Sequence, residues 1–187
     1  MDRGGLMRGA CLAVALAVVG GGALAHPHQY FDQQVALTLG TKRADISVVI
    51  IPSVDGAASL VSDLDADQDG QLSQPEANAF ANDLLAGLSL MVDGAAVILP
   101  TPMLTLPPVE ALSTGAAGIR LDVGVDLVLA ERQDHSVTLA VAYDRYDHDW
   151  FIQPYLKPDF AALMGQVAIT RSAAGDRATV EFRSKQP

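Results

Sequence analysis

The chain has 187 residues, 50% of them hydrophobic, and a formal net charge of −10 at pH 7. This length suffices for one domain with a hydrophobic core. The negative charge disfavours nucleic acid and anionic membrane surfaces as partners. Cys11 is the single cysteine, which excludes a disulfide framework and a thiolate metal site.

Residues 1–25 have the pattern of a secretory signal peptide. Two arginines precede an apolar run at 10–19, and Ala23-Leu24-Ala25 provides a small-x-small cleavage site. A membrane span needs roughly twenty apolar residues, so we expect cleavage before His26 and no membrane-spanning segment. A secreted animal domain would more often carry disulfides. We therefore expect a periplasmic or secreted protein, with a bacterial periplasm favoured.

Residues 65–76 place oxygen ligands where a twelve-residue calcium loop needs them. The predicted ligands are Asp65, Asp67, Asp69, the backbone carbonyl of Gln71, Ser73 directly or through a water, and Glu76 through both carboxylate oxygens. Gly70 stands at the sixth position, where the chain must turn sharply. This set of oxygens indicates a Ca²⁺ ion, because zinc or copper would require nitrogen or sulfur ligands.

The loop resembles that of the EF-hand calcium-binding family, and the resemblance covers residues 54–88. Apolar residues at i, i+3, i+4 spacing predict a helix on each side of the loop. The predicted faces consist of Val54, Ala57, Ala58, Val61 and Leu64 before the loop and of Ala77, Phe80, Ala81, Leu84, Leu85 and Leu88 after it. Pro75 fits the first turn of the second helix, where its missing N–H costs nothing.

The rest of the chain has mostly the patterns of β-strands. Strands are predicted at 30–39, 45–51, 90–99, 119–129, 136–143, 166–170 and 179–182, with Asp93-Gly94 as a hairpin turn within 90–99 and residues 172–176 as a second turn. This order predicts an α+β fold in one domain, residues 26–187. The domain is mainly an antiparallel β-sheet or sandwich, with the EF-hand helix–loop–helix inserted after its second strand.

The sequence contains no motif that predicts an enzyme. A Gly-x-Ser-x-Gly elbow, a phosphate-binding glycine-rich loop and a His-Glu-x-x-His pair are all missing. Aromatic residues are concentrated at 150–160, where they are interleaved with Pro154 and Pro158, and we expect an irregular segment that packs over one end of the sheet. A surface for a protein partner is the alternative interpretation of that segment.

The histidines suggest a second kind of metal site. After cleavage His26 would present a free amine and an imidazole, a pair that suits copper or nickel, and His28 follows two residues later. Pro27 excludes chelation through a deprotonated amide at that position. His148 could add a third ligand, as could His135 in the polar turn at 131–134. The alternative is a mobile, solvated N-terminus.

A second resemblance involves the whole mature chain. His26-Pro27-His28, the 65–76 loop and Tyr143-Asp144 together resemble uncharacterised periplasmic proteins often encoded beside nickel, cobalt or zinc transporters. That resemblance implies an accessory in metal handling, with a transporter or another envelope protein as partner. The sequence thus favours a calcium-binding protein that is not an enzyme. A transition-metal accessory and a copper-dependent oxidase built on His26 are the alternatives.

Overall fold

The structure is a computed structural model that describes residues 30–129, 134–146 and 149–184. The expected signal peptide, His26, His28 and His148 lie outside the described residues. None of the helices within the described ranges is long and apolar enough to cross a membrane.

The described chain forms ten strands and four helices. In chain order they are β1 (Phe31–Leu39), β2 (Arg43–Pro52), α1 (Val54–Leu64), α2 (Gln74–Ala86), β3 (Leu88–Val92), β4 (Ala95–Val97), β5 (Met103–Thr105), α3 (Val109–Ser113), β6 (Ile119–Asp126), β7 (Asp134–Val141), β8 (Trp150–Leu156), α4 (Pro158–Leu163), β9 (Met164–Arg171) and β10 (Arg177–Ser184). They build two five-stranded sheets, which we call sheet A (β5-β6-β2-β1-β8) and sheet B (β4-β3-β7-β10-β9).

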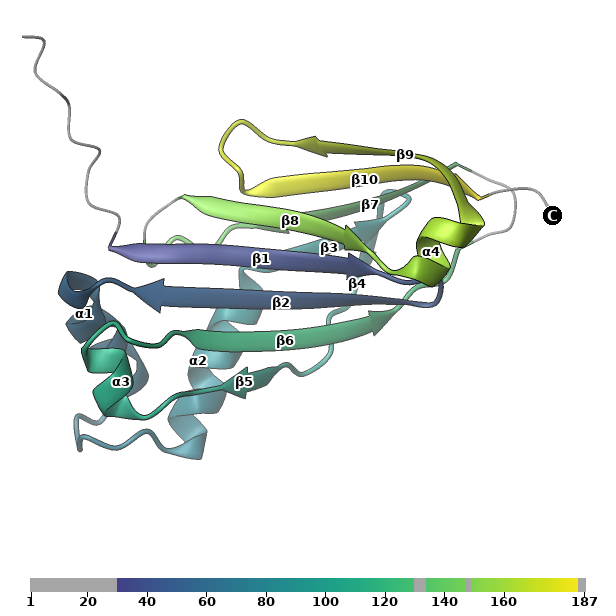
Figure 1. The fold of residues 1–187 in the computed structure, drawn as a ribbon. Coiled ribbons are helices and arrows are strands. Elements are labelled where there is room, and N and C mark those ends of the chain that lie inside the picture. The colour runs from purple at the N-terminus through teal and green to yellow at the C-terminus, as the bar shows by residue number, and fades with distance from the viewer. Residues whose placement is uncertain (1–29, 130–133, 147–148, 185–187) are drawn as a thin grey trace, which may run out of the picture.

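The two sheets share one hydrophobic core. Inward residues alternate along the strands: β1 buries Val35, Leu37 and Leu39, and β7 buries Val137 and Leu139. All of them belong to the same buried cluster, to which α2 also contributes. In Figure 1 sheet A lies in front, with α2 and β3 behind it. The β-rich, mostly antiparallel architecture predicted from alternation is therefore confirmed.

Two helices follow β2 directly, as the sequence predicts. The buried side of α1 consists of Gly56, Ala57, Leu60 and Leu64, whereas Val54 is 72% exposed. Ala57 and Leu64 are thus buried as predicted, but Gly56 and Leu60 complete the buried face in place of Val54, Ala58 and Val61. A Cβ on Gly56 would lie 2.5 Å from the backbone oxygen of Tyr30. Glycine at this position allows α1 to pack closely against the start of β1.

The second helix is shorter than its apolar pattern predicts. α2 buries Ala77, Phe80, Ala81 and Leu84 as expected, but it ends at Ala86. Leu88 opens β3 instead and pairs with Val141 of β7. Gly87 caps the helix, and its amide donates to the carbonyls of Leu84 and Leu85. The loop and both helices thus span residues 54–86.

Both predicted hairpin turns are present. Asp93 and Gly94 have φ angles of 51° and 80° between β3 and β4, the left-handed pair of a type I′ turn. Gly175 has a φ of 75° in the turn between β9 and β10.

The aromatic segment at 150–160 is not irregular, and this prediction was wrong. Residues 150–156 form β8, which pairs in parallel with β1, and Ile152 is fully buried. Pro154 is compatible with this strand because β8 lies at the edge of sheet A, and an edge tolerates a residue without an N–H. The parallel pair also makes sheet A mixed rather than purely antiparallel.

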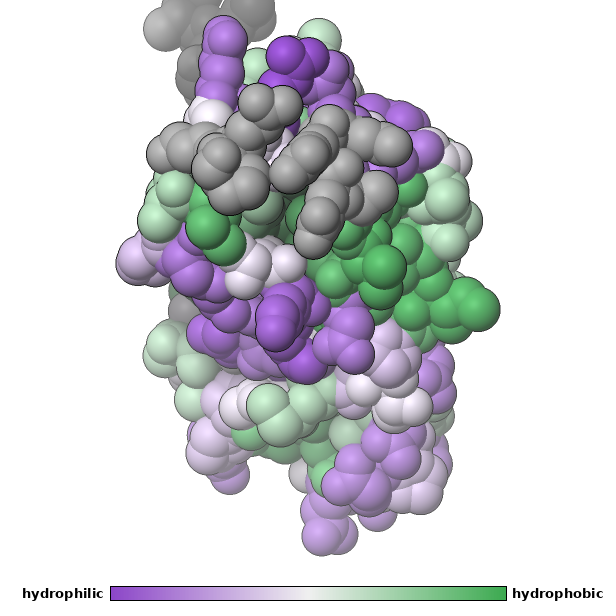
Figure 2. All heavy atoms as spheres, turned by 90° about the vertical axis from the view of Figure 1, so that its right-hand side faces the viewer, coloured by the Kyte–Doolittle hydropathy of each residue, from purple (hydrophilic) through white to green (hydrophobic). Residues whose placement is uncertain are grey.

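The surface is not uniformly polar despite the acidic composition. At the end of the molecule shown in Figure 2, hydrophobic residues gather in one area among hydrophilic ones. Among the described large apolar side chains, Ile98 and Val128 are the most exposed, at 91% and 88%.

Candidate metal centre

The loop at 65–73 connects the ends of two well-defined helices. Asp65 is the C-cap of α1, and its amide donates to the carbonyl of Val61. Ser73 is the N-cap of α2 and forms a capping box with Glu76. Pro75 occupies the first turn, as predicted. These caps fix both ends of the loop, so that Asp65 and Glu76 face each other.

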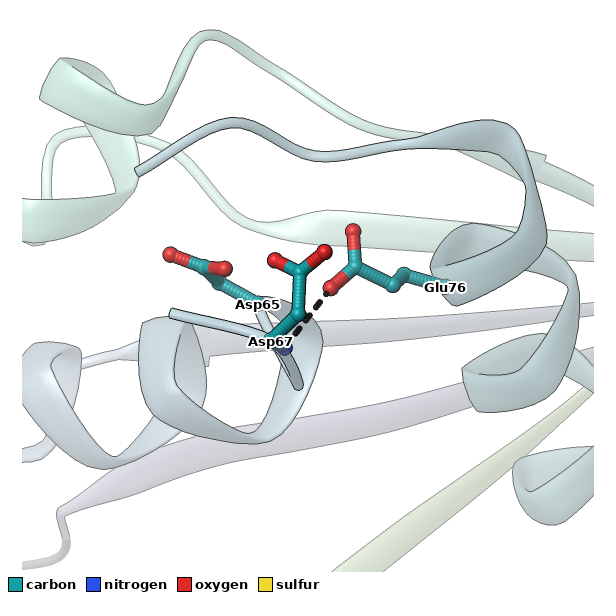
Figure 3. A group of neighbouring side chains, drawn as sticks. All are labelled: Asp65, Asp67 and Glu76. Atoms are coloured by element: carbon teal, nitrogen blue, oxygen red, sulfur yellow. Dashed lines mark hydrogen bonds between the residues drawn. The ribbon is translucent and has the colours of Figure 1, made fainter. Parts of the chain in front are cut away.

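Three of the predicted ligands lie together. One carboxylate oxygen from each of Asp65, Asp67 and Glu76 lies within 4.8 Å of the other two. Figure 3 shows the three side chains converging from the loop and from the start of α2. Asp65 is only 7% exposed, whereas Asp67 is exposed. The group of three carboxylates is therefore buried on the side of Asp65 and open to solvent on the side of Asp67.

Backbone amides hold the first two carboxylates in place. Oδ1 of Asp65 accepts the amide of Asp69 at 3.1 Å, and Oδ2 accepts the amide of Gly70 at 2.9 Å. Oδ1 of Asp67 also accepts the amide of Asp69, at 3.2 Å. Asp69 is outside the three-residue group, and its own Oδ1 accepts the amide of Gln71 at 2.8 Å. The loop thus curls around its acidic side chains.

Glu76 closes the loop through both of its oxygens. Oε1 accepts the amides of Ala66 and Asp67 at 2.7 and 3.3 Å. Oε2 accepts the hydroxyl and the amide of Ser73 at 2.7 and 2.9 Å. These bonds, with those from Ser73 the strongest, lower the pKa of Glu76 to about 2. Glu76 therefore stays ionised at any physiological pH.

Asp67 has the opposite shift. The hydrogen bond from the Asp69 amide lowers its pKa, but desolvation and the negative charges of Asp69, Glu76 and Asp65 outweigh that bond. The net result is a raised pKa, which reports mutual repulsion among the loop carboxylates. A bound cation would relieve this repulsion.

The backbone turns at two positions with positive φ. Gly70 has a φ of 81°, as the sixth position of the loop requires, and no atom lies within 4 Å of where its Cβ would be. Glycine is needed there for backbone conformation and not for space. Gln68 has a φ of 62°, which the sequence did not indicate because glutamine rarely adopts this conformation.

No arginine or lysine of the described residues forms an ion pair with the loop carboxylates. The flanking helices are instead paired with Arg145, whose Nη2 lies 3.1 Å from Asp83 of α2 and whose Nη1 lies 3.8 Å from Asp63 of α1. Arg145 thus links the two helices outside the loop. The negative charge of the loop itself has no side-chain counterion within the described ranges.

Ser73 and His135 have contacts that the sequence did not indicate. The Ser73 hydroxyl donates to Glu76 as part of the helix cap. His135 is not in a polar turn; it lies in β7, is 3% exposed, and its Nδ1 is 2.8 Å from Oδ2 of Asp93. The Asp93 carboxylate also accepts the amide of Ser136. His135, the one histidine among the described residues, thus braces the β3–β4 hairpin.

One cavity of the described structure lies away from the loop. It has a volume of about 670 Å³ and opens on the outer face of sheet A, between Phe151 and Tyr155 of β8 and Met103 of β5. None of the loop residues lines it. Its charged residues, such as Arg120 and Asp122, are paired with each other. The cavity is therefore separate from the group of loop carboxylates.

No protein-family model, curated protein or solved structure matches the chain. Both family resemblances therefore depend on their sequence motifs alone. The interpretation of the 65–76 loop as an ion-binding loop depends on the geometry described above.

Proposed function

We propose that the protein binds one calcium ion in the 65–76 loop, which with α1 and α2 forms an EF-hand. The observation that supports this most strongly is the convergence of Asp65, Asp67 and Glu76 without a basic partner among the described residues. Gathered carboxylates repel one another, and a divalent cation is the partner that removes the repulsion. On this proposal the protein is a secreted or periplasmic binding protein and not an enzyme.

The donor types favour calcium over a transition metal. The group offers carboxylate oxygens, and Gln71 could add its backbone carbonyl, while no histidine or cysteine belongs to it. Ca²⁺ accepts roughly 6–8 such oxygens in a flexible shell, whereas zinc and copper prefer nitrogen or sulfur. Waters on the open side at Asp67 would complete the shell.

Glu76 would have to exchange hydrogen bonds in order to bind. Each of its oxygens already accepts two N–H or O–H donors, and an oxygen has about two lone-pair sites. Bidentate coordination therefore competes with the helix cap and with the amides of Ala66 and Asp67. We expect a modest affinity for this reason, in the roughly 10⁻⁴–10⁻³ M range of extracellular calcium modules.

Calcium is proposed to be structural and not a signal. Phe80 and Leu84 of α2 are 4% and 0% exposed in the shared core. Opening the helix pair would expose these side chains at a cost of about 1.5–3 kcal/mol each. Sensor EF-hands instead open onto a Met-rich groove, and α2 contains no methionine.

The alternative of a transition-metal accessory remains a prediction. His26, His28 and His148 lie outside the described residues, so no described contact favours it. Copper or nickel binding that is lost when one residue is added before His26 would support a terminal-amine site.

The ligand assignment is tested by two single substitutions. Glu76→Gln removes a charge and bidentate coordination, and we expect calcium affinity to fall by about two orders of magnitude. Gln71→Ala leaves the backbone carbonyl in place and serves as the matched control, with less than about a threefold loss. Titration calorimetry measures both. Equal losses from the two changes would contradict the register of the loop.

A further inference from the structure

Each sheet has two edges, and three of these four edges are protected against pairing with another strand. β5 of sheet A and β4 of sheet B have only three residues each. β8, the other edge of sheet A, carries Pro154 next to its central residue and offers no N–H there. Short edge strands and edge prolines are common means of preventing association between sheets.

The fourth edge, β9, has none of these protections. It is eight residues long and contains no proline, and its first charged residue is Arg171 at its end. Its pairing with β10 is regular from Ala178↔Arg171 to Phe182↔Val167. Figure 1 shows β9 at the upper edge of the molecule, with no other helix or strand of the described residues beyond it. A long edge strand without a charged residue before its last position is a template for another strand.

The side of β9 that faces the core is also incompletely covered. Ile169 is 39% exposed although its partner on β10, Val180, is fully buried. Val167, opposite Phe182, is only partly buried. Arg171 anchors the end of β9 to sheet A by donating from Nε to the carbonyl of Ile152 at 3.0 Å. The apolar strip at 167 and 169 therefore lies at the open edge, where an added strand would cover it.

We propose that β9 pairs antiparallel with β9 of a second copy of this chain, which joins the two B sheets edge to edge. An antiparallel strand is its own complement, because a two-fold axis places each N–H opposite a C=O of the other copy. A partner must itself present an unprotected edge strand. A second copy of this chain meets this requirement because it carries the same β9.

Charge also favours a contact between copies at this edge. Two chains that each carry a net charge of −10 repel one another over most of their surface. The β9–β10 hairpin differs, since it carries three arginines and two acidic residues. These are Arg171, Arg177, Arg183, Asp176 and Glu181. The hairpin is thus a part of the acidic chain where copies can approach without that repulsion.

Sedimentation equilibrium of the purified protein over a wide concentration range tests this proposal. We expect a reversible monomer–dimer equilibrium. Ile169→Lys places a charge in the paired edge and should raise the dimer dissociation constant at least about tenfold. Ile98→Lys makes the same change at a residue that is 91% exposed beyond β4, at the other edge of sheet B, and should leave the constant unchanged. A monomer at every concentration would overturn the proposal, as would a dimer weakened by Ile98→Lys and not by Ile169→Lys.

Hydrogen exchange on the unmodified protein provides a second measurement that does not depend on the folding of a variant. Amides of residues 166–170 that point away from β10 should become protected as protein concentration rises, while those of β4 should not change. Concentration-independent exchange at 166–170 in a sample that sediments as a dimer would place the interface elsewhere and overturn the proposal.

Discussion

Two groups of carboxylates in this molecule differ in how their charge is balanced. On the outer face of sheet A, Asp122 accepts two hydrogen bonds from Nε of Arg120, at 2.8 and 3.0 Å. Asp45 lies 2.7 Å from Nε of Arg43 and 2.6 Å from Nζ of Lys157. Each of these two carboxylates is therefore balanced by a basic side chain.

The loop carboxylates have only amide and hydroxyl donors and one another. Asp67 has a raised pKa because desolvation and neighbouring carboxylates outweigh the hydrogen bond from Asp69, whereas Arg120 lowers the pKa of Asp122. The comparison shows that acidic residues alone do not indicate a cation site. Convergence without a basic partner is the informative feature, and it distinguishes the loop from the sheet.

The largest expected effect comes from removing calcium. If the dissociation constant is near 1 mM, then 10 mM calcium stabilises the folded state by about 1.4 kcal/mol, or roughly 4 °C in melting temperature. Chelation should remove this increment in the wild-type protein and should have no effect in Glu76→Gln. Scattering should show no change of shape. A hydrophobic dye that reports new apolar surface on adding calcium would replace the structural role with a sensor role.

A smaller effect is expected from two glycines with the same backbone conformation. Gly70 and Gly94 have φ angles of 81° and 80°, and neither has an atom within 4 Å of its Cβ position. Alanine at either position should cost about 1 kcal/mol of unfolding free energy, through backbone strain alone. Denaturant titration measures this cost, and calorimetry separates the sites. Only Gly70→Ala should weaken calcium binding; a loss with Gly94→Ala as well would mean that calcium is bound elsewhere.

The smallest effects should have opposite signs in the two regions. Asp122 has a pKa below its ordinary value of 3.8, so its ion pair stabilises the folded state above that pH and the contribution is lost on acidification. Asp122→Asn should therefore lower stability at pH 7 by about 0.5 kcal/mol, as for an exposed pair.

For Asp67 the dependence of folding stability on pH has the opposite sign. Its folded pKa is raised, so the ionised side chain opposes folding at neutral pH and protonation relieves that penalty as the pH falls toward 3.8. Asp67→Asn should raise the melting temperature at pH 7 without calcium and lower calcium affinity. A lower melting temperature in both Asp67→Asn and Asp122→Asn without calcium would show that the loop carboxylates do not repel one another.

Most of the fold could be predicted from short-range patterns. Alternation located the strands that are buried on one face, and Asp93-Gly94 identified a turn that needs two left-handed residues. Patterns failed where tertiary contacts decide the outcome. Pro154 is compatible with a strand only because β8 lies at an edge, and the buried side of α1 depends on the approach of Gly56 to Tyr30.

The candidate site could be predicted in its ligand types but not in its hydrogen bonds. Spacing identified Asp65, Asp67 and Glu76, which converge, and Asp69, which lies outside that group. The four donors on Glu76 and the left-handed Gln68 follow from how the loop closes on itself. His135 was misplaced because its partner, Asp93, is 42 residues away in the chain, a separation that no local pattern reports.

Titration calorimetry of calcium into the wild-type protein, after removal of divalent cations, tests the central claim most directly. We expect saturable binding of one ion per chain with a dissociation constant of roughly 10⁻⁴–10⁻³ M. Absence of saturable binding up to about 10 mM calcium, ten times the upper end of that range, would contradict it. Binding of several equivalent ions would contradict it equally, because the described residues contain one such carboxylate group.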